Sequence, residues 1–223
     1  MAKIPENFEQ NYDLLEYLAL QHMGSTFIRT PLTAIKGYSQ LLLQELDDAS
    51  TDERQQEYLE SINYIAEQLM ENIGVFVNAV PFIFGTENLY TNEIDLLKII
   101  SEFISTKQEK TGFQIEQDLP TSFPIITADE KKIYEALHYM VELVKQIHPM
   151  NKGRVDVSAR HTQDFVIISI STEKREVLQL KPNPELFIVQ SIAELHGGKL
   201  QIENGDDSWD ISLILPLQSK RAP

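Results

Sequence analysis

Residues 25–37 read STFIRTPLTAIKG, and this stretch lies inside a long apolar pattern with a helical period. Apolar or small residues recur every three or four positions over 14–46 and again over 59–80. That spacing places them along one face of a helix. The polar stretch DDASTDERQ at 47–55 separates the two patterns. We therefore predict two long helices that form an antiparallel hairpin within residues 1–82.

A lone hairpin cannot bury an apolar seam on each of its helices. A homodimeric four-helix bundle is the economical solution, because two hairpins cover each other's seams. The alternative is that the hairpin packs against the rest of the same chain. Pro31 lacks a backbone N–H, so we expect it to bend the first helix.

Residues 83–223 have a different hydrophobic pattern, in which segments with a helical period and segments that alternate like strands follow one another. We expect Asn92 to cap the first helix, and Gly197-Gly198 to stop the last. This order of elements predicts an α/β sandwich with helices on one face of a mixed sheet, so the whole chain is α+β. The expected helices cover 94–110, 129–148 and 184–196, and the expected strands cover 113–119, 153–160, 164–171, 199–204 and 209–217.

The composition narrows the classes of function. A net charge of −15 disfavours nucleic acid and anionic lipid as partners. No run approaches 18 apolar residues and the start lacks a signal peptide, so we expect a cytoplasmic protein without a membrane segment. There is no cysteine, and the histidines are scattered, so we expect no metal site and no thiol chemistry.

Three stretches resemble two-component sensor histidine kinases. STFIRTPLTAIKGYSQLLL at 25–43 is similar to that family's phosphoacceptor segment, which reads roughly S-H-E-L-R-T-P-L-T-x-I-x-G-Y. Residues 93–137 and 187–217 resemble the beginning and the end of its ATP-binding domain. The resemblance implies a dimerisation and phosphoacceptor hairpin over 1–82 and an ATPase-type domain over 83–223.

The match puts Thr26 in the place of the phosphoacceptor histidine and Phe27 in the place of the neighbouring acid. A threonine hydroxyl without an adjacent base is a poor nucleophile, so we expect no autophosphorylation. His22, one turn earlier, is either an exposed helix histidine or a displaced acceptor. We expect a partner-binding surface on this flank of the helix, made of Thr26, Arg29, Thr30 and Lys36.

The residues matched to the nucleotide site also depart from the family's pattern. Asparagines that hold Mg²⁺, an aspartate that reads adenine, and glycines that allow close backbone approach are all replaced. Side chains at the glycine positions should obstruct the ligand, and nearby Glu142 should be solvated. The degenerate positions are Tyr139 and Leu143 for the asparagines, Thr172 for the aspartate, Lys174 and Glu176 for the adenine loop, and Asn183 and Glu185 for the phosphate loop.

The resemblance, taken with these replacements, implies a pseudokinase that needs no cofactor or metal. We expect it to act in two-component signalling or a phosphorelay, by docking the receiver domain of a response regulator or a partner histidine kinase through the hairpin. Two alternatives stay open. Thr30 lies where the family places a threonine implicated in phosphatase chemistry on a phospho-aspartyl partner, and His22 could carry a phosphoryl group.

Overall fold

The computed structural model describes residues 28–45, 52–111, 114–147, 154–173, 184–205 and 208–217. The chain divides into two compact units, Met1–Gly85 with Pro182–Pro184, and Thr86–Lys181 with Glu185–Pro223. No helix of these described ranges is both long and apolar enough to cross a bilayer. Each unit is described by itself.

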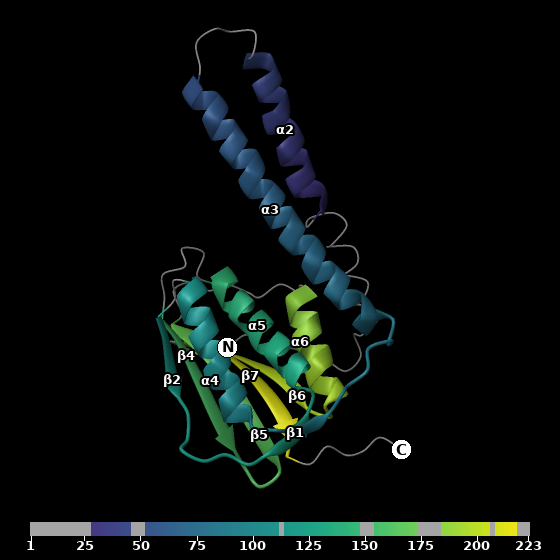
Figure 1. Ribbon diagram of the computed structural model, residues 1–223, viewed down its shortest axis with the longest axis vertical. Coiled ribbons are helices and arrows are strands. Elements are labelled where there is room, and N and C mark those ends of the chain that lie inside the picture. Colours follow the sequence, from purple (N-terminus) through teal and green to yellow (C-terminus); the bar gives the residue numbers. More distant parts are fainter. Residues whose placement is uncertain are drawn as a thin grey trace. The chain divides into compact units, whose positions relative to one another are not determined.

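The first unit is a helical hairpin. Its helices α2 (Thr30–Glu45) and α3 (Asp52–Ile83) run antiparallel to each other (Figure 1). The rings of Tyr38 and Tyr58 meet between them, with centroids 6.0 Å apart. The predicted hairpin is therefore confirmed, whereas its pairing into a four-helix bundle concerns a second copy and stays a prediction.

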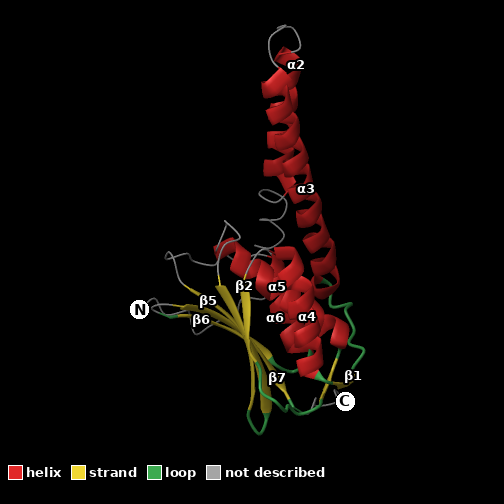
Figure 2. Ribbon diagram, turned by 60° about the vertical axis from the view of Figure 1, so that its left-hand side comes forward, coloured by secondary structure: helices red, strands yellow, loops and turns green. Residues whose placement is uncertain are grey.

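The second unit is an α/β sandwich. Helices α4 (Leu96–Thr111), α5 (Glu130–Ile147) and α6 (Pro184–Leu195) cover one face of a five-stranded sheet (Figure 2). Strands β2 and β4 are parallel and the other neighbours are antiparallel, in the order β2-β4-β5-β7-β6. The strands are β2 (Gln114–Asp118), β4 (Arg154–His161), β5 (Phe165–Glu173), β6 (Lys199–Asn204) and β7 (Ser208–Pro216).

The core of this unit follows from strand alternation. Every second residue of β5 and β7 is buried, and the residues between them are only partly covered. A sheet that packs helices on one face and meets water on the other has this pattern. Fully buried side chains from the helices, such as Phe103 and Leu137, complete the core. The predicted α+β class, with helices on one face of a mixed sheet, is confirmed.

One predicted boundary is wrong. Asn92 does not cap a helix, because it begins strand β1 (Asn92–Ile94), which pairs antiparallel with β3 (Ile126–Ala128). The cap of α4 is Asp95, whose Oδ1 accepts a hydrogen bond from the backbone N–H of Lys98 at 3.2 Å. Pairing with a strand more than thirty residues away in sequence overrides the local capping preference.

Candidate functional site

The flank predicted to bind a partner lies at the start of α2. Arg29, Thr30 and Lys36 are all exposed. The hydroxyl of Thr33 donates to the carbonyl oxygen of Arg29 at 2.8 Å, a local bond that occupies this backbone acceptor. The structure thus leaves both cations and the Thr30 side chain open to solvent. The other two candidates from the sequence, Thr26 and His22, lie outside the described residues.

Pro31 lies close to a change in helix geometry. It is the second residue of the α-helical part of α2. Ile28 and Arg29, directly before α2, have π-helical geometry. Wider turns of this kind are frequent at functional positions of helices. The proline therefore coincides with a change of helical geometry beside Arg29.

A second feature of the hairpin is an exposed apolar row on α3. Ile62, Leu69 and Phe76 are half-buried, whereas their neighbours one position along the helix are exposed. Leu59 and Ile73, which the sequence pattern places in the same seam as Ile62, Leu69 and Phe76, belong to the exposed set. The exposed apolar row comprises Leu59, Met70, Ile73 and Val77, with exposed fractions between 41% and 65%. Spacings of eleven, three and four place these side chains on one helix face.

On α5, the two positions matched to metal-binding asparagines are filled by core residues. Leu143 is fully buried, and Tyr139 is nearly so. Both lie among the apolar side chains that α5 directs toward the sheet. A leucine offers no lone pair to a cation, and Mg²⁺ requires oxygen ligands. These positions therefore contribute to packing.

Glu142 is not the solvated side chain that the sequence suggests. Its Oε1 lies 3.3 Å from Nζ of Lys107 on α4 and 3.7 Å from Nδ1 of His138. Lys107 Nζ is also 2.6 Å from His138 Nδ1. The carboxylate is drawn to α4 because that helix brings a cation against α5, a contact between residues far apart in the sequence.

Thr172, the residue matched to the adenine-reading aspartate, is bonded within the protein. It is buried on β5, and its hydroxyl donates to the carbonyl oxygen of Arg154 at 3.0 Å. Its register partner on β7 is Trp209, whose side chain is 4% exposed and fills the inner face of the sheet. No hydrogen-bond partner lies within reach of Trp209 Nε1 among the described residues. Sequence reasoning missed Trp209, although strand alternation placed it on the buried face.

At the phosphate position, Glu185 lies in the first turn of α6 and is buried. Burial raises the pKa of its carboxyl above the ordinary value, and the nearby negative charge of Glu142 raises it further. A helix N-terminus usually favours anions. Here a carboxyl of the protein already lies at that end, and when ionised it would repel a phosphate.

The remaining nucleotide positions, Lys174, Glu176 and Asn183, lie outside the described residues. Within the described ranges, the acidic and histidine side chains form no group that could hold a metal ion. The structure describes four of the positions matched to the nucleotide site, Tyr139, Leu143, Thr172 and Glu185. They offer two buried core side chains, one hydroxyl bonded to the backbone and one buried acid, a set that lacks the oxygen ligands Mg²⁺ requires at position 143.

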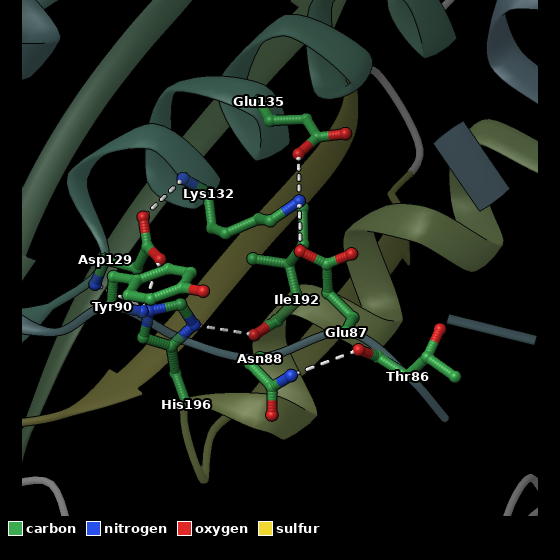
Figure 3. Close-up of polar contacts among 9 residues, drawn as sticks. All are labelled: Thr86, Glu87, Asn88, Tyr90, Asp129, Lys132, Glu135, Ile192 and His196. Atoms are coloured by element: carbon green, nitrogen blue, oxygen red, sulfur yellow. Dashed lines mark hydrogen bonds and ion pairs between the residues drawn. The ribbon is translucent and has the colours of Figure 1, made fainter. Parts of the chain in front are cut away.

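A different polar cluster surrounds the N-terminus of α5 (Figure 3). Asp129 caps this helix, since its Oδ1 accepts a hydrogen bond from the backbone N–H of Lys132 at 3.2 Å. Its Oδ2 accepts a second one from the backbone N–H of Tyr90 at 2.7 Å. Its own backbone N–H donates to Nε2 of His196 at 3.0 Å. We call these four residues, Tyr90, Asp129, Lys132 and His196, the Asp129 joint.

The side chain of Lys132 extends the joint. Its Nζ lies 2.9 Å from Oε1 of Glu87 and 2.9 Å from Oε2 of Glu135. These carboxylates raise the pKa of Lys132 although burial, the largest single influence, acts to lower it. Glu87 and Tyr90 belong to the stretch 86–91, which we call the connector because it follows the hairpin. The connector is thus fixed to α5 at two points.

His196 joins α6 to the same place. It follows the last residue of α6, and Gly197, with φ of 73°, turns the chain in a left-handed conformation. The N–H groups of Gly197 and Gly198 donate to the carbonyl oxygens of Glu194 and Ala193, both at 2.8 Å. This is the Schellman pattern at a helix end. The predicted stop at Gly197-Gly198 is confirmed, whereas the role of His196 became visible only in the structure.

The helical hairpin matches a known protein family. Residues 28–73 match the family described as His Kinase A (phospho-acceptor) domain. The match covers α2 and most of α3, including Arg29, Thr30 and Lys36. The match ends before the connector and does not include the second unit. That unit is compared through relatives whose similarity covers most of this chain.

Two curated relatives extend the comparison to both units. The circadian input-output histidine kinase CikA of Synechococcus elongatus is 25% identical over 88% of this chain. The sensor protein DivL of Caulobacter vibrioides is 28% identical over 79% of it. The chain spans only 31% and 25% of the lengths of these two proteins. The similarity therefore concerns one part of each relative.

A solved structure has the same fold. The histidine kinase ThkA, in a crystal structure with the response regulator protein TrrA, matches 97% of this chain with a TM-score of 0.69. The match covers 65% of that chain at 18% sequence identity. At this level of identity the likeness concerns the fold alone.

Proposed function

Because this chain belongs to the two-component sensor histidine kinase family, we propose that it is a catalytically degenerate member with a binding and regulatory role. In this role it docks a response regulator receiver domain, or a partner histidine kinase, through the helical hairpin. It does not phosphorylate itself, and the second unit serves as a folded scaffold without nucleotide.

The observation that carries the proposal is the state of the nucleotide positions. Leu143 is fully buried where a carboxamide would meet the metal, and Glu185 places a buried acid where phosphates would lie. A triphosphate would have to enter beside this buried side chain, which occupies the first turn of α6. No rearrangement of a leucine side chain supplies the missing oxygen ligand.

The adenine position supports the same conclusion independently. Thr172 uses its hydroxyl on the backbone of a neighbouring strand, and Trp209 fills the adjacent buried space. Moving an indole out of a close-packed core to admit a base would cost several kcal/mol, on the order of a Trp truncation. The residues matched to the base and to the phosphates thus both support the proposal that the second unit works without nucleotide.

The proposed docking surface is the flank of α2 that carries Arg29, Thr30 and Lys36, together with Thr26. Two exposed cations, seven positions apart along the helix, suit an acidic surface on a partner. The crystal structure of ThkA with TrrA supports this class of partner, since it joins a kinase of the same fold to a response regulator.

The exposed apolar row on α3 supports homodimerisation. Four large apolar side chains on one helix face are costly to leave in water, and a second hairpin would cover them. Packing against another part of the protein is the alternative. Sedimentation velocity on the full chain separates the two, because a monomer of 25.6 kDa at micromolar concentration would contradict the dimer.

The docking proposal is tested by binding of the full chain to purified receiver domains from the same cell. We expect micromolar or tighter binding to one of them, lost on combining Arg29→Glu with Lys36→Glu. The matched control combines Lys131→Glu with Arg160→Glu, exposed cations of the second unit. If both pairs reduce binding equally, the effect is one of net charge and the surface is wrong.

Nucleotide binding is tested in parallel by calorimetry with Mg-ATP. We expect no heat of binding at millimolar nucleotide. Saturable binding would directly refute the proposal that the second unit works without nucleotide. The two tests are independent, since an active kinase could also dock a receiver.

One observation favours phosphatase activity as a second candidate. Thr30 is exposed at the first residue of α2, where its hydroxyl could orient water toward a phospho-aspartyl group. The experiment incubates the protein with a phosphorylated receiver and follows its decay. A faster decay that Thr30→Ala abolishes would support the activity, and equal decay with and without the protein would exclude it.

A further inference from the structure

The buried ring of His196 holds two backbone groups at once (Figure 3). Its Nε2 lies 3.0 Å from the backbone nitrogen of Asp129, and its Nδ1 lies 2.8 Å from the carbonyl oxygen of Ile192. A backbone N–H can only donate, so Nε2 carries no proton. The proton is therefore on Nδ1, which donates to Ile192. These partners assign His196 as a neutral imidazole.

Asp129 is the point at which three segments meet. Its backbone N–H reaches His196 at the end of α6, and its Oδ1 caps α5 through the N–H of Lys132. Its Oδ2 holds the connector through the N–H of Tyr90 at 2.7 Å. The connector follows α3 in the chain after a short turn at Phe84 and Gly85. The joint thus links the segment that leaves the hairpin to two helices of the sandwich.

We propose that His196 is an acid-sensitive latch, which holds α6 and the connector to the start of α5 when neutral and releases them when protonated. An imidazolium has N–H on both ring nitrogens, so its Nε2 can no longer accept the N–H of Asp129. Two donors would then face each other in a buried place, which is unfavourable. This inference stands independently of the docking proposal.

The charges around the ring determine how the latch responds. Asp129, from the start of α5, is the carboxylate that acts on His196 directly. Lys132, with Glu87 from the connector and Glu135 from α5, forms the neighbouring ion group, which carries one negative charge overall. Glu194 precedes the ring on α6 and Lys199 follows it in β6. The burial of His196 lowers its pKa, and this effect exceeds the opposing influence of Asp129 and Ile192.

Protonation would redirect the carboxylate of Asp129. The imidazolium is attracted to this anion, which in the neutral state holds the N–H groups of Tyr90 and Lys132. A ring that turns toward the carboxylate competes with Tyr90 for Oδ2. The contact at risk is therefore the one that holds the connector, so acid would loosen the segment between hairpin and sandwich before the fold is lost.

The sign of the effect follows from the lowered pKa of His196. The native protein favours the neutral ring, so the stabilisation is complete above the ordinary histidine pKa of about 6.5 and declines as the pH falls below it. Acidification in that window is the condition that opens the latch.

The experiment on the wild type follows histidine resonances and amide hydrogen exchange of the full chain by NMR between about pH 7.5 and about pH 5. We expect His196 to titrate below about pH 6.5, with protection of the Asp129 and Tyr90 amides falling together by about tenfold after correction for intrinsic exchange. If the ring charges while both amides keep their protection, the latch is wrong. It is also wrong if His196 stays neutral until global unfolding.

Two variants test whether protonation of His196 itself causes the loss of amide protection. His196→Gln keeps an acceptor that can reach the Asp129 N–H but cannot be charged, so protection of both amides should become independent of pH. His161→Gln, at an exposed position on β4, is the matched control and should retain the wild-type pH dependence. A pH dependence that survives in His196→Gln would assign the effect to another group and overturn the proposal.

Discussion

The nucleotide positions and the Asp129 joint belong to the same α/β unit, yet they have opposite polar character. At the nucleotide positions, Leu143 and Trp209 fill space with apolar surface and Glu185 is a buried acid with a raised pKa. At the joint, both carboxylate oxygens of Asp129 and both ring nitrogens of His196 have hydrogen-bond partners in the protein backbone. The difference shows that one folded unit can pair its polar groups completely at one place and fill another with packed apolar side chains.

The largest expected effect tests the tight packing behind the joint. A Cβ added at Gly198 would overlap the backbone carbonyl group of Ile214, so Gly198→Ala must displace β7. We expect a loss of about 3 kcal/mol or more in the free energy of unfolding, measured by urea denaturation. Gly74→Ala, on the exposed face of α3 with open space around it, should instead stabilise by about 0.5–1 kcal/mol. Equal behaviour of the two glycines would contradict this difference.

The next effect addresses the nucleotide positions. Leu143→Asn restores a carboxamide where one is matched, but it buries that amide in an apolar core. We expect destabilisation by about 2–3 kcal/mol, and still no heat of Mg-ATP binding in calorimetry, because Glu185 and Trp209 remain. Recovery of nucleotide binding by this single change would show that the site is latent.

Removing the centre of the joint should have a comparable or slightly smaller effect. Asp129→Ala deletes a helix cap and leaves the N–H of Tyr90 without its acceptor, so we expect a loss of about 2 kcal/mol in urea denaturation. Asp95→Ala, which removes the exposed cap of α4, is the control and should cost about 1 kcal/mol. A joint that matters only as a cap would give the same loss in both variants.

The smallest effect concerns charge at the phosphate position. The pKa of Glu185 is raised, so the native protein favours the protonated acid. Its presence therefore lowers stability as the pH rises through and above the ordinary glutamate value. We expect Glu185→Gln to raise the free energy of unfolding at neutral pH and to change it little near pH 4, whereas Glu93→Gln, at an exposed position of β1, should change it little at either pH. A loss of stability at neutral pH would mean that the ionised carboxylate has a stabilising partner.

Much of the fold was predictable because it depends on local periodicity. The hairpin, the order of helices and strands in the sandwich and the glycine stop after α6 all follow from apolar spacing and from the conformational freedom of Gly197. The sequence-based predictions were wrong where a contact with a segment distant in sequence determines the local structure. Asn92 became a strand residue because 126–128 pairs with it, and Glu142 is drawn to Lys107 of another helix.

The candidate site divides in the same way. Leucine at position 143 and threonine at position 172 differ from the carboxamide and the acid that the resemblance implies there, and this can be read from the sequence. That Trp209 lies beside Thr172 requires the register of β5 and β7, which the sequence alone does not give. The Asp129 joint was missed altogether, because its bonds involve backbone groups of Tyr90 and Ile192 that residue identity does not mark.

Trp209 is the single tryptophan of the sequence, and it lies buried on the inner face of the sheet. Its fluorescence emission therefore reports on the sandwich alone, because the hairpin contains tyrosines but no tryptophan. An emission maximum that shifts to the red at a higher denaturant concentration than the loss of helical circular dichroism would reveal the two units melting one after the other.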